Sequence, residues 1–187
     1  MTIEEELHTD SDSGRMMYAF SDLLEELKFA WEFLQTHLRE LNEEDFFYTP
    51  SGLGRVCIAQ HIGHLAYLEK EVGKKAEIPF SFRLDLLDDI FCENDACIKA
   101  SALPGYVEIR EYCDLIHQTF MDEVKYAKKP DLLFDLINQI YIVSAEVREI
   151  LVDLGRGVEE LKPDSKRVKC RKDKGLPPQY KLPVYAN

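Results

Sequence analysis

Residues 60–69 read QHIGHLAYLE, and this stretch decides how the fold is interpreted. Within it His61, His64, Leu65 and Leu68 lie three or four positions apart, which places them on one face of a helix. Histidine is costly on the apolar face of a buried helix unless it has a partner. We therefore expect a helix that turns His64 into a packed core, with His61 beside it.

The same spacing of apolar side chains recurs in four long segments. It predicts helices over about residues 17–42, 55–72, 105–127 and 132–154, with glycines at 73 and 155 as stops. A short helix is expected near residues 84–91, inside a longer connection from 79 to 103. Four long helices with one extended connection between the second and the third predict an all-α four-helix bundle.

The chain of 187 residues is long enough for one domain with a sizeable core. We divide it into a flexible acidic N-terminus (1–15), a bundle (16–160) and a basic, proline-containing C-terminal tail (161–187), which we expect to be extended. The acidic start is unlike a targeting signal, and no apolar run approaches the roughly 20 residues that span a bilayer. Five scattered cysteines predict reduced thiols. These features predict a cytoplasmic protein without a membrane segment.

Charge is distributed unevenly along the chain. The net charge is −12, but residues 162–187 carry eight basic and two acidic side chains, a net of +6, which leaves −18 on residues 1–161. An acidic body repels phosphate and argues against nucleic acid as its partner. For the tail three roles stay open: a solvated arm, a segment lying along its own acidic body, or a binder of another acidic surface.

Three motifs point to a known family. Residues 62–69, IGHLAYLE, are similar to GHLxxxE, and residues 101–112, SALPGYVEIREY, are similar to LPSxEEVxxY. The second motif is followed by His117, and residues 150–155, ILVDLG, are similar to LxxLG. In this order and spacing the motifs resemble the DinB/YfiT-like superfamily of four-helix bundles, which includes bacterial thiol-dependent transferases. The resemblance covers roughly residues 16–155 and implies a DinB-like bundle with a long connection between helices 2 and 3.

The resemblance also implies a particular metal site. The family's usual site is three histidines that hold nickel, zinc or iron, one from the second helix and two, four residues apart, from the fourth. His64 matches the first, and counting back from Gly155 places the other two at Gln139 and Val143. Valine has no lone pair, and an amide is a poor ligand for these metals. The resemblance therefore implies that the triad is incomplete in this chain.

Two interpretations of His64 follow. In the structural one it is a neutral core histidine, hydrogen-bonded to Gln139, Tyr141 or Glu146 of the fourth helix. In the functional one His61, His64 and Glu146 form a variant site of two nitrogens and one carboxylate, suited to a divalent metal.

These observations favour a non-catalytic binding or interaction protein that has lost the family's metal site and needs no cofactor. The alternative is a metal-dependent, thiol-transferase-like enzyme with a variant site around His64. The family resemblance also implies a homodimer. A bundle pocket beside His64 would offer room for a small-molecule ligand.

Overall fold

A computed structural model describes residues 20–39, 41–52, 55–80, 85–92, 98–127 and 129–157. The predicted N-terminal segment 1–15 and the tail 161–187 lie outside these residues. Within the described ranges the chain forms helices and turns and contains no strand, which confirms the all-α expectation. None of the helices that the structure describes is long and apolar enough to cross a membrane.

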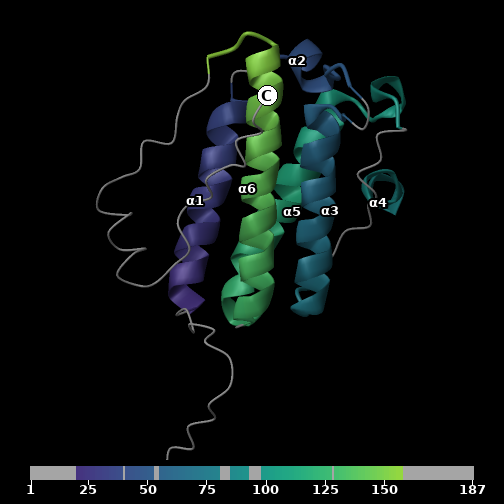
Figure 1. Cartoon of the computed structure of the whole chain (residues 1–187). Helices are drawn as coiled ribbons and strands as arrows, with labels where there is room; N and C mark the ends of the chain where they lie inside the picture. Colours follow the sequence, from purple (N-terminus) through teal and green to yellow (C-terminus); the bar gives the residue numbers. More distant parts are fainter. Residues whose placement is uncertain are drawn as a thin grey trace, which may run out of the picture.

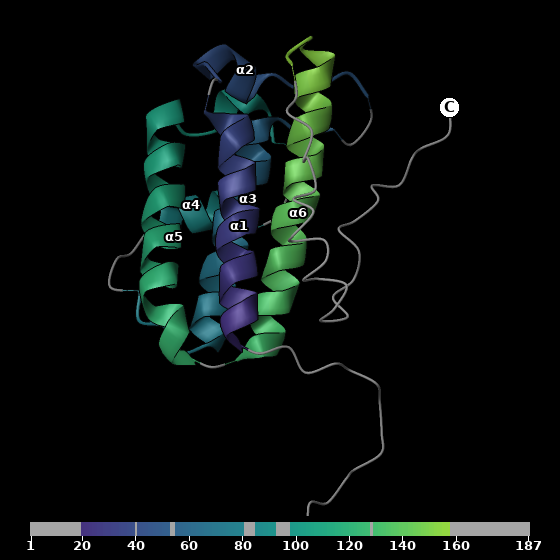
Figure 2. The same cartoon turned by 90° about the vertical axis from the view of Figure 1, so that its left-hand side faces the viewer.

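Four long helices lie side by side, and short helical segments cover one end and one side of them (Figures 1 and 2). The long helices are α1 (Phe20–Leu38), α3 (Ile58–Lys75), α5 (Tyr106–Ala127) and α6 (Pro130–Asp153). The short ones are α2 (Glu43–Phe47), α4 (Asp85–Phe91) and a 3₁₀ turn, η1 (Ala100–Ala102).

The long helices pack in the order α1, α6, α3 and α5 around a shared core. In both views α1 and α6 run in one direction and α3 and α5 in the other (Figures 1 and 2). Two contacts fix this arrangement at the ends. Lys129 Nζ donates to the Lys75 carbonyl at 2.7 Å, which brings the end of α3 beside the start of α6. Arg156, just after α6, pairs with Asp45 of α2.

The core consists of the apolar side chains whose three- and four-residue spacing predicted the helices. Burial of a side chain of this size stabilises the fold by roughly 1.5–3 kcal/mol. Examples from the four long helices are Leu27, Leu34, Ile62, Leu65, Ile109, Ile116, Phe120, Leu136, Ile140 and Val147.

Two predicted helix ends are wrong. The first helix ends at Leu38, four residues before the predicted end at residue 42, because Asn42 caps the separate helix α2. Gly73 does not stop its helix, because α3 continues to Lys75. Gly73 is buried, and a Cβ atom there would lie 2.5 Å from the Phe80 ring, so the glycine serves close packing. Gly155, by contrast, has φ +69° directly after α6, which confirms it as a C-terminal stop.

The short helix α2 was not expected. Asn42 caps it, because Asn42 Oδ1 accepts a hydrogen bond from the Asp45 main-chain N–H at 2.8 Å. The Asp45 side chain accepts from the Asn42 N–H in return, which completes a capping box. Phe46 is fully buried and contacts Tyr106 edge to face. This helix therefore closes the end of the fold where α1 ends and α5 begins.

The predicted short helix within the long connection exists as α4, and it packs on α3 at a glycine. The buried Phe91 ring lies directly over Gly63, where a Cβ atom would overlap it. Phe91 also stacks on Tyr112 of α5, with ring centroids 5.8 Å apart. The absence of a side chain at Gly63 is therefore what lets α4 approach the groove between α3 and α5.

Gly63→Ala tests this packing. Alanine favours a helix over glycine by about 1 kcal/mol, but the overlap with a buried ring should outweigh this and leave a net loss of about 1–3 kcal/mol. Urea unfolding of Gly63→Ala and Gly157→Ala measures the difference, since Gly157 has open space around it and should tolerate alanine. The combined Gly63→Ala, Phe91→Ala variant should lose less than the sum of the single changes. Strict additivity would contradict the contact.

Candidate functional site

His64 is held by main chain from α4. Its Nδ1–H donates to the Phe91 carbonyl at 2.8 Å, and its ring lies beside Tyr67. A carbonyl can only accept, so Nδ1 carries the hydrogen, and in the neutral form of the imidazole Nε2 is the nitrogen with the lone pair. His64 is partly exposed. The expectation that it points into the core is therefore wrong, because α4 draws the ring to the outer side of α3.

The predicted partners of His64 lie elsewhere. Gln139 is exposed on α6, and the Tyr141 hydroxyl donates to Glu26 of α1. The hydrogen bond from His64 runs to Phe91, so the expectation of a partner on the fourth helix is wrong. Val143 is buried as a core side chain. The α6 positions that the resemblance assigns to metal-binding histidines thus hold a solvent-facing amide and a core valine.

His61 is the more buried of the two histidines. Burial lowers the pKa of His61 to about 4, and nearby positive charge from His64 and Arg55 adds to this effect. The imidazole of His61 is therefore neutral near pH 7, the form that has a lone pair to offer. His64 lies close enough to His61 to affect the pKa of His61.

Glu146, the third residue of the predicted variant site, is half-buried on α6. Burial raises its pKa, the neighbouring Glu149 raises it further, and Arg55 opposes both. Neither histidine is among the charges that shift it. Among the residues that the structure describes, no three His, Cys, Asp or Glu side chains come together in a group that could hold a metal ion. The described geometry therefore does not fit a three-ligand metal site, and metal binding at His61, His64 and Glu146 stays a prediction.

A buried network anchors α4 one to two turns farther along α3. Lys70 pairs with Asp88 of α4, and the Tyr112 hydroxyl donates to the other oxygen of Asp88 at 2.9 Å. Burial raises the pKa of Tyr112, and the charge of Asp88 raises it further, so the phenol remains a neutral donor. Breaking such a buried pair by removing one partner costs about 3–5 kcal/mol. These groups are therefore part of the framework.

A second buried pair joins α3, α5 and α1. His117 Nδ1 donates to Glu69 Oε1 at 2.8 Å, and the indole of Trp31 stacks on the imidazole, with centroids 3.8 Å apart. Glu69 is only 1% exposed, and its Oε2 has no hydrogen-bond partner among the described residues. Glu69 ends the first sequence motif, and His117 follows the second. Their pairing was missed because 48 positions separate them and no local spacing connects them.

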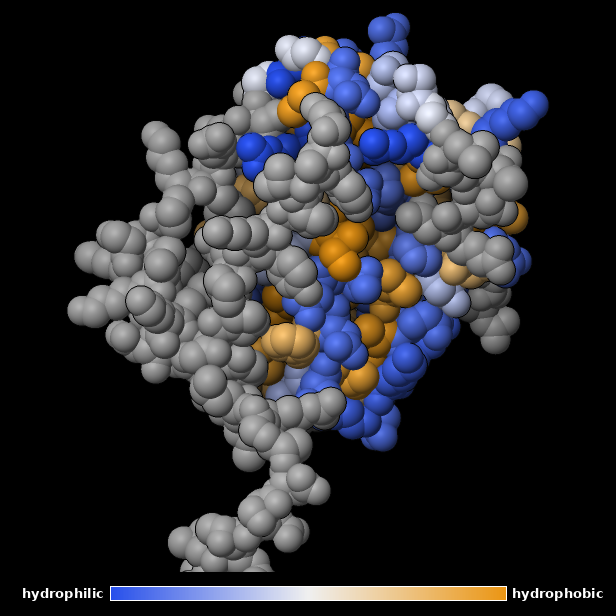
Figure 3. Space-filling view, in the orientation of Figure 1, coloured by the Kyte–Doolittle hydropathy of each residue, from blue (hydrophilic) through white to orange (hydrophobic). Residues whose placement is uncertain are grey.

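The outward side of α6 carries apolar side chains that face solvent, as α4 and α5 also do. Ile142 is 46% exposed and Val152 is 60% exposed. In Figure 3, hydrophobic and hydrophilic patches are interspersed over the part of this side that is not grey. With Ala145 and Glu149 these residues follow a spacing of three and four and form one helix face. We call this outward side the α6 face; its residues are Asp135, Ile142, Ala145, Glu146, Glu149, Val152 and Asp153.

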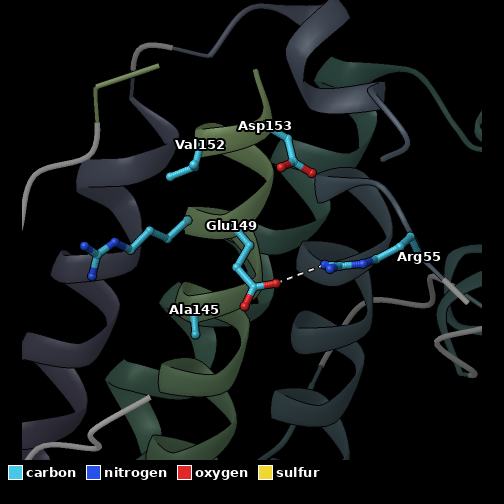
Figure 4. A pocket seen from close by; sticks show the side chains of 6 residues that line it. Arg55, Ala145, Glu149, Val152 and Asp153 are labelled. Carbon is cyan, nitrogen blue, oxygen red and sulfur yellow. Dashed lines mark hydrogen bonds and ion pairs between the residues drawn. The ribbon is translucent and has the colours of Figure 1, made fainter. Parts of the chain in front are cut away.

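A shallow pocket of about 290 Å³ lies at the upper end of the α6 face. Figure 4 shows Arg55, just ahead of α3, reaching toward Glu149 of α6, and Arg55 Nη1 donates to Glu149 Oε2 at 3.0 Å. Ala145, Arg148, Val152 and Asp153 complete the lining. The predicted small-molecule pocket beside His64 is not this one, since His64 does not line it.

Comparisons with known proteins identify no similar protein. No family model, no curated protein and no solved structure matches the chain. The function is therefore argued from the residues themselves. His64, Glu69 and Lys70 of α3 make contacts with α4 or α5, whereas the α6 face presents apolar and charged side chains to solvent.

His61 gives a pH dependence of stability with a definite sign. The unfolded chain takes up a proton at His61 near pH 6.5, but the folded chain resists it until about pH 4. The unfolded state therefore binds more protons in this window, and stability falls as pH falls from 6.5 to 4, by up to roughly 3 kcal/mol from this residue. Urea unfolding at pH 7 and pH 5 should show a smaller loss for His61→Gln than for the unmodified chain.

The comparison isolates His61, because all other titrating groups are shared by the two proteins. Equal losses of stability between pH 7 and pH 5 would mean that His61 is not buried in its neutral form.

Proposed function

We propose that this chain is a DinB-like four-helix bundle that works as a non-catalytic interaction protein and binds its partner through the α6 face. The order of the helices, the long connection between α3 and α5 and the three sequence motifs support the family. The single observation that carries the function is the solvent exposure of Ile142 and Val152 on α6. Scattered apolar side chains are normal on a surface, but apolar residues aligned on one helix face favour a docking role.

The residues that could perform chemistry support a non-catalytic role. Val143 has no lone pair, and Gln139 points to solvent. Lys70, Asp88 and Tyr112 bind one another, and Glu69 binds His117. Each of these groups stabilises the packing of α4, α3 or α5. Internal pairs of this kind are what a fold needs when polar side chains are buried.

The charges of the α6 face define the chemistry of the partner. Asp135, Glu146, Glu149 and Asp153 lie on this side, and Arg55 neutralises part of their charge. The raised pKa of Glu146, caused first by burial and then by Glu149, indicates negative charges close enough to repel. A cation from a partner would relieve this repulsion. The partner we propose is therefore a segment in which lysines or arginines alternate with apolar side chains.

One observation favours the alternative, a metal-dependent transferase-like enzyme. His64 Nδ1 donates to the Phe91 carbonyl, so in the neutral imidazole Nε2 is the nitrogen that could bind a metal, and metal-bound histidines are commonly oriented in this way. Against it stands the described geometry, which gathers no three suitable ligands. The two candidates differ in what Nε2 of His64 binds.

Binding of a model peptide tests the proposed function. The probe is a fluorescein-labelled 12-residue peptide of alternating lysine and valine, titrated with the full-length protein and followed by fluorescence anisotropy. Replacing both apolar anchors, Ile142→Gln with Val152→Gln, should weaken binding roughly tenfold, which corresponds to about 1.4 kcal/mol. Both positions are exposed, so the fold should tolerate the change.

A matched control removes apolar side chains from other places that are at least as exposed. Leu86→Gln with Val107→Gln, on α4 and α5, should leave peptide affinity unchanged. A peptide of alternating glutamate and valine should not bind. The proposed function is wrong if the two double variants bind the lysine peptide equally well.

A further inference from the structure

We propose that the chain's own basic segment, residues 162–187, docks in cis on the α6 face and competes there with the partner. The proposal rests on the proposed function, because it assigns the same face an internal occupant. Bound in this way, the segment regulates access to the face. Three independent features of the chain support it: charge, reach and the mixture of residue types.

Charge complementarity is the first feature. The segment has a net charge of +6, and the rest of the chain has −18. On the α6 face the carboxylates of Asp135, Glu146, Glu149 and Asp153 outnumber the cations of Arg55 and Arg148. Potentials of opposite sign draw the segment toward this face and raise its local concentration there. The covalent connection adds to this concentration.

Reach is the second feature. The described chain leaves α6 at Asp153, turns at Gly155 and is fixed by the pair between Arg156 and Asp45. From this end, Ile142 lies about 17 Å back along the helix axis. Cys170 lies 14 positions after Arg156, and an extended chain of this length spans up to about 46 Å. The basic run at residues 166–174 can therefore lie alongside the whole α6 face.

The mixture of residue types is the third feature. The basic run contains Val168, and residues 175–187 read GLPPQYKLPVYAN, a stretch rich in proline, tyrosine and aliphatic residues. These apolar side chains can cover Ile142 and Val152, while the lysines and arginines meet the carboxylates. Because proline fixes part of the backbone, such a segment loses less conformational entropy when it docks than a freely variable one.

A disulfide-trapping experiment tests the cis contact in the full-length protein. Ile142→Cys is introduced on a background of Cys92→Ser and Cys97→Ser, so that Cys170 is its expected partner, because Cys57 and Cys113 are buried. Mild oxidation with diamide should form an intramolecular disulfide between Cys170 and the introduced thiol, identified by peptide mass spectrometry. Val107→Cys, 62% exposed on α5, is the matched control and should react much more slowly.

Each result supports or overturns the proposal. Neutralising the basic run (Lys166→Gln, Arg167→Gln, Lys169→Gln, Arg171→Gln, Lys172→Gln) should slow the trapping at Ile142→Cys toward the rate of the α5 control. Raised salt should act in the same direction, because it screens the attraction. Equal trapping rates at positions 142 and 107 would overturn the docking. A disulfide between two chains, seen as a dimer on a non-reducing gel, would overturn the cis arrangement in favour of a second copy as occupant.

The lysine–valine peptide separates this proposal from the proposed function. If the proposed function and the cis docking are both correct, the chain with the neutralised basic run binds the peptide several-fold more tightly than the unmodified chain. The reason is that residues 162–187 then compete less well for the α6 face. If the neutralised and the unmodified chain bind the peptide equally well, while the Ile142→Gln, Val152→Gln variant still binds it more weakly, the α6 face binds a partner but residues 162–187 do not occupy it. Absence of peptide binding by both chains removes the proposed function, whatever the trapping shows.

Discussion

The close approach of α4 to α3 at Gly63 is the constraint on which the rest of the site depends. The Phe91 ring fills the space that a side chain at position 63 would occupy and stacks on Tyr112 of α5. In this position the Phe91 carbonyl accepts from His64, and Asp88 meets Lys70 and Tyr112. The absence of a Cβ at position 63 thus allows α4 to pack against α3 through the Phe91 ring, the hydrogen bond from His64 and the buried pair of Lys70 and Asp88. The same approach turns His64 away from α6.

In this arrangement α3 holds the short helix α4 and the helix α5 in place, whereas the outward side of α6 is exposed. On α3 the side chains of His64, Glu69 and Lys70 bind α4 or α5, so they contribute to stability and specificity of packing. On the α6 face, by contrast, the apolar side chains of Ile142 and Val152 are exposed to solvent. We therefore assign interaction to α6. The basic segment that follows the helix supplies opposite charge within the same chain, which makes regulation by this segment the natural complement of the binding face.

Much of the fold could be predicted from the sequence, and much of the site could not. Apolar spacing predicted the four long helices and α4, because burial dictates that period directly. It misjudged Gly73, since a glycine under Phe80 looks the same in sequence as a helix stop. The orientation of His64 was wrong because it depends on α4, whose docking no local pattern encodes. The pair of Glu69 and His117 was missed because the two residues lie on different helices, 48 positions apart. The DinB-like family remains a proposal that rests on motifs.

The state of His64 tests the account most directly. In protein labelled with ¹⁵N-histidine, a two-bond ¹H–¹⁵N spectrum at pH 8, where an unperturbed imidazole is neutral, identifies which nitrogen carries the hydrogen. His64→Gln assigns the signal. We predict hydrogen on Nδ1, bound to the Phe91 carbonyl, and an Nε2 signal that one equivalent of zinc leaves unchanged. Hydrogen on Nε2 would contradict the contact with α4, and a zinc-induced shift of Nε2 would favour the metal-dependent enzyme.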